Sequence, residues 1–356
     1  MWMSGGPSQI DTFDPKAGDI SLFKTIDTNV KGLQLSATLP LLARQANHLA
    51  IIRSMTYPRA IYDRGLHLMR TGYETNSPID HPSFACVLAK ELGDDHANLP
   101  RYVNLYPIAN RNNWPFGPGI LGKNYTWLEV GPNSEFVNPP ITPDQPCPLP
   151  PVEAFEFLDK ANGAAMRRAV AKAFDFSDEK AELRDAYGRG VFGNGCLLAR
   201  RLVERGVPVV EIMPLNDWAM RQNIAGRMPT VAGEMDAGMA TLTKDLHKRR
   251  LLDSILIVWM GVCGASPDLS QAKGRDHWSS GFSVVLAGGG VKGGQAIGKT
   301  SANGLMVEAF PVTPPELLAT IYTALGIDPH KANPTPAGLM VPLVERGNKA
   351  VQEALR

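Results

Sequence analysis

The sequence predicts an α/β protein: a three-layer α/β/α sandwich with a central, mostly parallel sheet. Short runs rich in valine and isoleucine alternate along the chain with helix-like segments. These runs are apolar at successive positions, which is typical of strands buried on both faces of a parallel sheet. The 356 residues, 44% of them hydrophobic, are enough to build such a core. We expect one domain that covers residues 1–356.

The first strand is expected at residues 1–4, where the chain begins directly with the apolar letters MWMS. The start has neither the charged lead nor the apolar stretch of a signal peptide. Because the apolar MWMSG runs straight into a Gly-Pro turn, the chain begins inside the expected strand, and we expect the natural N-terminus to lie further upstream. The other predicted strands are 49–55, 101–106, 207–215, 254–261 and 282–288.

Helices are predicted between these strands, at 39–47, 81–92, 178–188, 191–206, 230–250 and 313–326. Pro82 favours a helix start near residue 81, and Gly206 is expected to cap the helix over 191–206. The segment from about 107 to 150 is dense in proline, glycine and asparagine, so we expect a long loop or a lid there.

Composition excludes some classes of function. The chain has 36 basic and 35 acidic residues and a net charge of +1, so nothing indicates a nucleic-acid partner. No apolar run reaches the ~18 residues of a membrane-spanning helix. The four cysteines are far apart in the sequence, which indicates buried free thiols.

The segments that follow the strands are the places to look for chemistry, because ligands of α/β sheets bind beyond the carboxyl ends of the strands. Ser4, Ser8, Asp11 and Asp14 follow the first strand in a glycine-rich turn. Two carboxylates three residues apart can hold a hard cation. They can equally bond local amides in an Asx-type turn, and the spacing leaves both interpretations open.

Other strand ends carry fewer candidates. His67 follows the second strand in a predicted helix, where a lone histidine is more often packed than metal-bound. Asp217 follows the strand at 207–215. Asp276 and His277, in the stretch GRDHWSSGF, are either metal ligands or part of a solvated turn. The glycine run 288–294 fits a strand exit better than a nucleotide loop.

Several long segments together resemble one known family. They are MWMSGGPSQIDTFDPK, RSMTYP…MRTGY, HPSFACVLAKELG, YGRGVFGNGCLLARRLVERGV, GRDHW, LAGGGVKGGQAIG and PVTPPELLATIYTALGID. They resemble the domain of unknown function 1501 family, which belongs to the alkaline phosphatase and sulfatase superfamily. The resemblance covers nearly the whole chain and implies an alkaline phosphatase-like sandwich. It also implies a site with one or two divalent metals that cleaves phosphate or sulfate esters. Members often carry an export signal before the first strand.

The resemblance assigns roles to particular residues. Asp11, Asp14, Asp276 and His277 would bind zinc, manganese, calcium or magnesium, and Ser8 and Arg275 are the candidate catalytic residues. The substrate would be a phosphate or sulfate ester of a small molecule or a glycan. Two cations activate the nucleophile and neutralise the developing charge, which requires about six converging ligands.

The sequence departs from the family pattern at three other ligand positions. Ile61 and Tyr62 stand where the family has an asparagine or aspartate followed by histidine. Residues 218–221 (WAMR) replace the family's Trp-Asp-Thr-His, and residues 261–265 (GVCGA) replace its Gly-Glu-Phe-Gly-Arg. The expected result is weak or partial metal occupancy. Asp217 and His67 are the nearest substitutes, and neither has the family spacing.

Two hypotheses follow. The chain is a metal-dependent ester hydrolase with much of its metal site replaced, or it is a catalytically degenerate member that binds a ligand or a partner. A nucleotide-binding function that uses residues 288–294 ranks below both. Bound metal and turnover of phosphate or sulfate esters would distinguish the first two.

Overall fold

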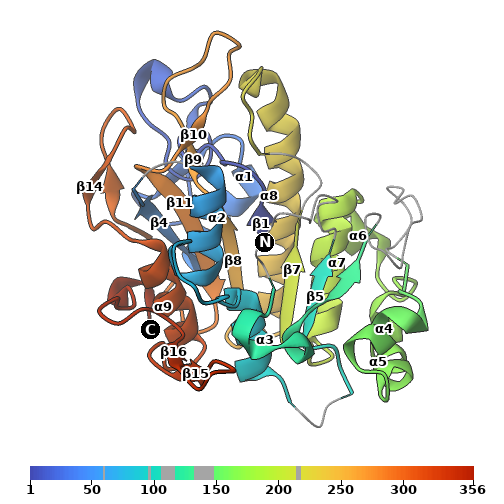
Figure 1. Ribbon diagram of the computed structural model, residues 1–356. Helices are drawn as coiled ribbons and strands as arrows, with labels where there is room; N and C mark the ends of the chain where they lie inside the picture. The colour runs from blue at the N-terminus through green and yellow to red at the C-terminus, as the bar shows by residue number, and fades with distance from the viewer. Residues whose placement is uncertain (59–60, 95–97, 106–116, 132–147, 214–217) are drawn as a thin grey trace.

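The computed structural model describes residues 1–58, 61–94, 98–105, 117–131, 148–213 and 218–356. Helices surround a central layer of strands, and the N-terminus lies in the middle of the molecule (Figure 1). The strands of the central layer are β1 (Trp2–Met3), β4 (Leu49–Met55), β5 (Tyr102–Leu105), β6 (Leu128–Val130), β7 (Val209–Ile212), β8 (Leu256–Gly261), β11 (Phe282–Gly288) and β12 (Gln295–Ile297).

Smaller strand pairs lie outside this layer. They are β2 (Thr25–Asp27) with β3 (Gln34–Ser36), β9 (Gly264–Ala265) with β10 (His277–Trp278), β13 (Lys299–Thr300) with β14 (Val307–Ala309), and β15 (Ala332–Pro334) with β16 (Met340–Pro342). The α-helices are α1 (Pro40–Ala43), α2 (Tyr62–Thr71), α3 (Phe84–Leu92), α4 (Val152–Leu158), α5 (Gly163–Val170), α6 (Ala181–Tyr187), α7 (Val191–Val203), α8 (Ile224–Lys248) and α9 (Pro314–Ala324).

Two hydrophobic cores, one on each face of the sheet, establish the three layers. Leu49 and Ile51 of β4 belong to one core, together with residues of α1, α6, α7 and α8. Ala50 and Ile52 belong to the other, together with residues of α2, α3 and α9. Successive side chains of a strand point to opposite faces, so β4 is buried on both sides, as the apolar run over its first four residues predicts. The predicted three-layer sandwich is confirmed.

The central layer consists of two hydrogen-bonded sheets side by side. One has the strand order β1-β8-β11-β4-β12, and the other has the order β6-β5-β7. Both contribute to the same two cores, because Val103 and Leu105 of β5 face the first core while Tyr102 faces the second. Most pairings are parallel, but β11 runs antiparallel to β4 and to β8.

The helix ends follow local signals, with some differences from expectation. The helix predicted at 81–92 begins at Phe84, because the Ser83 side chain accepts a hydrogen bond from the Cys86 N–H and caps it. The helix predicted at 230–250 begins earlier, at Ile224, and includes Pro229. Gly206 has a φ of +90° just beyond α7 and closes the turn there. Most of the loop predicted at 107–150 lies outside the described residues.

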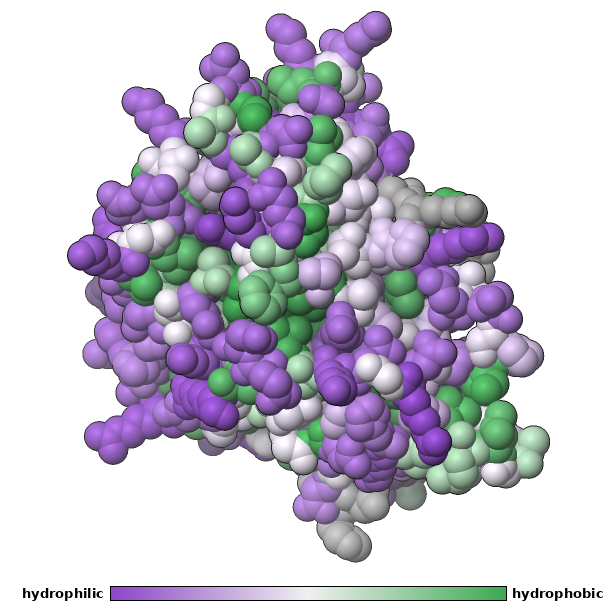
Figure 2. Space-filling model, turned by 90° about the vertical axis from the view of Figure 1, so that its left-hand side faces the viewer, coloured by the Kyte–Doolittle hydropathy of each residue, from purple (hydrophilic) through white to green (hydrophobic). Residues whose placement is uncertain are grey.

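No helix in the described ranges is long and apolar enough to cross a membrane. The face in Figure 2 is largely hydrophilic, with hydrophobic residues showing between the polar ones near the middle of the view, near the top and at the lower right edge.

Candidate functional site at the carboxyl ends of the strands

The loop after β1 is held against β9, the short strand that follows β8. The Gln9 side chain donates to the Ala265 carbonyl at 2.9 Å, and its Oε1 accepts from the Ala265 N–H at 2.9 Å. A Cβ on Gly6 would lie 2.3 Å from the Gly264 carbonyl oxygen, so only glycine permits this approach. The loop that carries the candidate carboxylates is therefore fixed by residues about 256 positions away in the sequence.

Asp11 lies at the centre of a buried ion pair. Its Oδ2 is 2.8 Å from Nε of Arg275, and both side chains are almost completely buried. Its carboxylate also accepts from the Ser8 hydroxyl at 2.6 Å and from the Leu22 N–H at 2.9 Å. Arg275 donates further to carbonyl oxygens, at 2.7 Å to Ile20 and at 3.1 Å to Ser266. The ion pair is thus fully hydrogen-bonded inside the protein.

Asp14 has its own cationic partners. Its carboxylate lies 2.9 Å from Nζ of Lys16 and 3.6 Å from Nε of Arg53, and it accepts a hydrogen bond from the Thr300 hydroxyl. Burial lowers the pKa of Arg53, and the charge of Asp14 partly offsets that effect. The two carboxylates after β1 therefore each neutralise basic side chains.

The segment GRDHW forms a turn beside the Asp11 ion pair. A Cβ on Gly274 would lie 1.9 Å from the carbonyl carbon of Arg221, which explains the glycine. Asp276 points outward with 72% of its side chain exposed, and it lies 3.8 Å from the 61% exposed Arg221. His277 is half-buried in β10, whose register pairs it with Ala265 of β9.

The predicted site residues thus fall into three groups. The Arg275–Asp11 contact brings the loop after β1 and the GRDHW segment together. His67 is separate: its Nδ1 is hydrogen-bonded to the Tyr73 carbonyl oxygen at 2.8 Å, within and just after α2. Asp217 lies outside the described residues. Within the described ranges, no three or more His, Cys, Asp or Glu side chains form a group that could hold a metal ion.

Comparison with known proteins identifies the family. The sequence profile described as "Protein of unknown function (DUF1501)" matches residues 1–147 and 151–355. The chain belongs to this family. A search of curated proteins found no match.

Solved structures show only a distant likeness to this DUF1501 protein. The lipoteichoic acid synthase LtaP from Listeria monocytogenes is 10% identical, with 97% of this chain and 74% of that chain covered and a TM-score of 0.41. The phosphonate monoester hydrolase SpPMH from Silicibacter pomeroyi is 12% identical, with 88% and 71% covered and a TM-score of 0.35. A 2-O GAG sulfatase is 14% identical, with 100% and 73% covered and a TM-score of 0.39. Likeness at this level carries no argument about activity.

Tyr62 contributes to the site of the DUF1501 protein in a way that the sequence did not indicate. Its ring stacks on His277 with centroids 5.0 Å apart, and its hydroxyl oxygen accepts from the Gly5 N–H at 3.3 Å. A residue noted only as a replacement therefore joins the loop after β1 to the GRDHW segment. In the sequence, only its position after the second predicted strand could have indicated that Tyr62 lies at the site.

Cys263 lies between β8 and β9, next to the Gly264–Ala265 segment that contacts the loop after β1. It is buried, and this burial raises its pKa to about 12. The thiol therefore stays protonated at neutral pH, and a protonated thiol is a poor nucleophile.

Proposed function

We propose that this DUF1501 protein is a catalytically degenerate member, which binds a ligand or a partner at the carboxyl ends of its strands and does not hydrolyse esters through two cations. The buried Arg275–Asp11 ion pair carries this proposal. A cation that took Asp11 as a ligand would leave the Arg275 guanidinium buried and unpaired. Breaking a buried pair in this way costs about 3–5 kcal/mol.

The other candidate ligands support the same conclusion. The Asp14 carboxylate is already neutralised by Lys16 and Arg53, and Asp276 is exposed beside Arg221. Divalent cations need several oxygen or nitrogen ligands that converge on one point. We infer that these donors do not fit a two-cation centre.

The candidate nucleophile is also unsuited to attack. Ser8 is 1% exposed, and its hydroxyl donates a hydrogen bond to the Asp11 carboxylate. A substrate could reach its oxygen only if the loop after β1 moved away from Arg275. Within this proposal Ser8 has a structural role: it supplies one of the hydrogen bonds that satisfy the buried carboxylate.

The ligand class that we propose is a phosphate or sulfate ester of a small molecule or a glycan. Arg221 supports this choice. Its exposed guanidinium lies beside Asp276 of the GRDHW segment, and a guanidinium can bind such an anion by two parallel hydrogen bonds. His277 and Tyr62 form a stacked pair in the same region, which offers a flat surface to a sugar ring.

Metal content and turnover test the loss of catalysis. Purified protein is analysed for bound metal and assayed with p-nitrophenyl phosphate and p-nitrophenyl sulfate, with zinc, manganese, calcium or magnesium added. We expect no stoichiometric metal and no turnover that differs between wild type and His277→Ala. Stoichiometric metal together with turnover that is lost in Asp276→Ala or His277→Ala would instead establish the hydrolase.

A binding experiment tests the ligand class. Sulfated and phosphorylated oligosaccharides are titrated into wild type, Arg221→Ala and the control Arg168→Ala, whose arginine lies exposed on α5. We expect Arg221→Ala to weaken binding about tenfold, the loss of one charge-assisted contact, and Arg168→Ala to bind as wild type does. Equal affinities for all three proteins would exclude Arg221 from the site.

A further inference from the structure

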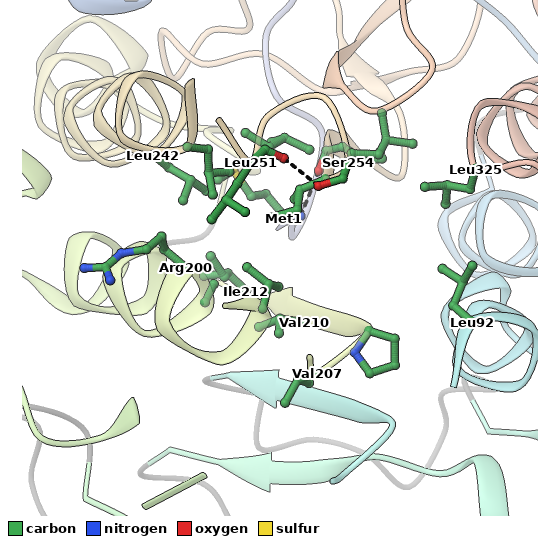
Figure 3. A pocket seen from close by; sticks show the side chains of 18 of the residues that line it. Met1, Leu92, Arg200, Val207, Val210, Ile212, Leu242, Leu251, Ser254 and Leu325 are labelled. Atoms are coloured by element: carbon green, nitrogen blue, oxygen red, sulfur yellow. Dashed lines mark hydrogen bonds between the residues drawn. The ribbon is translucent and has the colours of Figure 1, made fainter. Parts of the chain in front are cut away.

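A cavity of about 400 Å³ lies between β8 and β7. Figure 3 shows Met1 in the middle of it, with Leu251 and Ser254 on one side and Val210 and Ile212 on the other. The lining is largely aliphatic, with side chains that include Val203, Val210, Ile212, Leu246, Leu251 and Ile257. The cavity is partly open to solvent, and the apolar side chains that line it forgo contacts that a filled core would make.

The two strands that border this cavity have unused edges. β8 pairs along its length with β11, but on its other side β1 pairs only with Met260 and Gly261. β7 pairs with β5 on one side and is the edge strand of its sheet in the described part of the chain. The space between β8 residues 256–258 and β7 residues 209–212 is called the strand slot below.

A second cavity, of about 110 Å³, lies on the other face of the same slot. It shares Met1, Val210, Leu256 and Val258 with the larger cavity. The larger one is lined by residues of the first core, such as Ile212, and the smaller one by residues of the second core. The slot is therefore a gap in the central layer itself, hollow on both faces, and not a pocket between two helices.

The β1–β8 ladder leads directly into the slot. The register pairs Trp2 with Met260 and Met3 with Gly261. Three further residues before Met1 would align with Val258, Ile257 and Leu256, a length of about 10 Å. The Met260 N–H donates to the Met1 carbonyl, so the backbone groups of Met260 face β1. The N–H and C=O groups of alternate strand residues point to the same side. The backbone groups of Val258 and Leu256 therefore point into the slot.

The amino group of Met1 already occupies a ladder position. It donates to the Val258 carbonyl at 2.8 Å, as the amide N–H of a continuing strand would. It is buried, and burial lowers its pKa to about 6. A strand that entered from another direction would end against this group, whereas a segment joined to it would replace a buried amine by an ordinary amide.

We propose that the strand slot receives an extended segment of about three residues, joined to the amino group of Met1, which runs parallel to β8 and completes the sheet between β8 and β7. Trp2 faces the second core and Met1 packs against the first, so the side chains alternate in a defined order. The residue before Met1 faces the smaller cavity, the next faces the larger one, and the third faces the smaller again. Counted backwards from Met1, the strand slot thus favours a small side chain at the first position, a large one at the second and a small one at the third.

Two chains with N-terminal extensions test this order. One carries Gly-Ser-Ala-Leu-Ala before Met1, and the control carries Gly-Ser-Leu-Ala-Leu, which directs leucine to the smaller cavity. In both, the glycine and serine carry the new amino group toward water. Each is compared with the chain that begins at Met1 by urea denaturation and by amide hydrogen exchange.

We expect the Ala-Leu-Ala extension to raise the denaturation midpoint and to slow exchange of the Val258 amide by about tenfold, because that N–H gains a partner. The Leu-Ala-Leu extension should give a smaller rise. An Ala-Leu-Ala chain with an unchanged midpoint and unchanged exchange at Val258 would overturn the proposal. So would stabilisation by a free Ala-Leu-Ala peptide that the joined extension does not reproduce.

Discussion

Replacement of Arg275 by methionine tests the central energetic argument. The substitution keeps a long side chain but removes the positive charge 2.8 Å from Asp11. Asp11 is 0% exposed, so its carboxylate would remain buried with only the Ser8 hydroxyl and the Leu22 N–H as donors. We expect Arg275→Met to lower the free energy of unfolding by about 3–5 kcal/mol, the usual cost of removing one partner from a buried ion pair.

A double-mutant cycle isolates the pair. Guanidinium denaturation at pH 7 is measured for wild type, Arg275→Met, Asp11→Asn and the double variant. Asp11→Asn alone leaves the guanidinium unpaired, so the double variant should lose about 2 kcal/mol less than the sum of the single losses. Lys299→Met is the matched control: Lys299 lies 3.0 Å from Glu308, but both side chains are exposed, so its loss should cost about 1 kcal/mol or less.

A loss below about 1 kcal/mol for Arg275→Met, with additive effects in the cycle, would refute this reasoning. It would also remove the main support for the proposed function, because Asp11 would then be available to a cation at little cost.

Two further predictions concern the start of the chain and its glycines. In the chain that begins at Met1, burial lowers the pKa of the amino group from 8.0 to about 6. The unfolded chain therefore binds more protons than the folded chain between these values. Stability should rise by about 2 kcal/mol as the pH increases from 6 to 8. Urea midpoints across this range should show the rise, and N-terminal acetylation should abolish it; equal slopes for both forms would contradict the prediction. Gly274→Ala should cost about 3 kcal/mol, because its Cβ would meet the Arg221 backbone, whereas Gly233→Ala, with open space in α8, should add about 1 kcal/mol. Thermal denaturation checks both, and a shift in the same direction for the two variants would be inconsistent with this account.

The strands were predicted best where burial alone decides the pattern. The predictions at 49–55 and 282–288 agree with β4 and β11 at both ends. Both strands are buried on two faces, so their sequences are largely apolar, with Arg53, Ser54 and Ser283 as the polar exceptions. The same pattern carries no information about direction, and β11 runs antiparallel to both of its neighbours. Apolar composition reports burial, whereas direction depends on the connections between strands.

The candidate site was predicted in part. The sequence identified Asp11, Asp14 and the GRDHW segment as chemically notable, and the structure brings the first and the last together. It could not indicate that Arg275 neutralises Asp11, because the two residues are 264 positions apart. Nor could it indicate that Tyr62 stacks on His277. Such contacts depend on how distant segments pack, and charge and spacing do not encode that.

The sequence by itself therefore determined the three-layer class, the positions of the main strands and helices, and the family. These follow from short-range periodicity and from long motifs, which do not depend on what packs against them. Only the tertiary structure decided the direction of β11, the partners of the buried carboxylates and the gap beside β1. Each of these is a relation between segments far apart in the chain, so it exists only once the layers have packed.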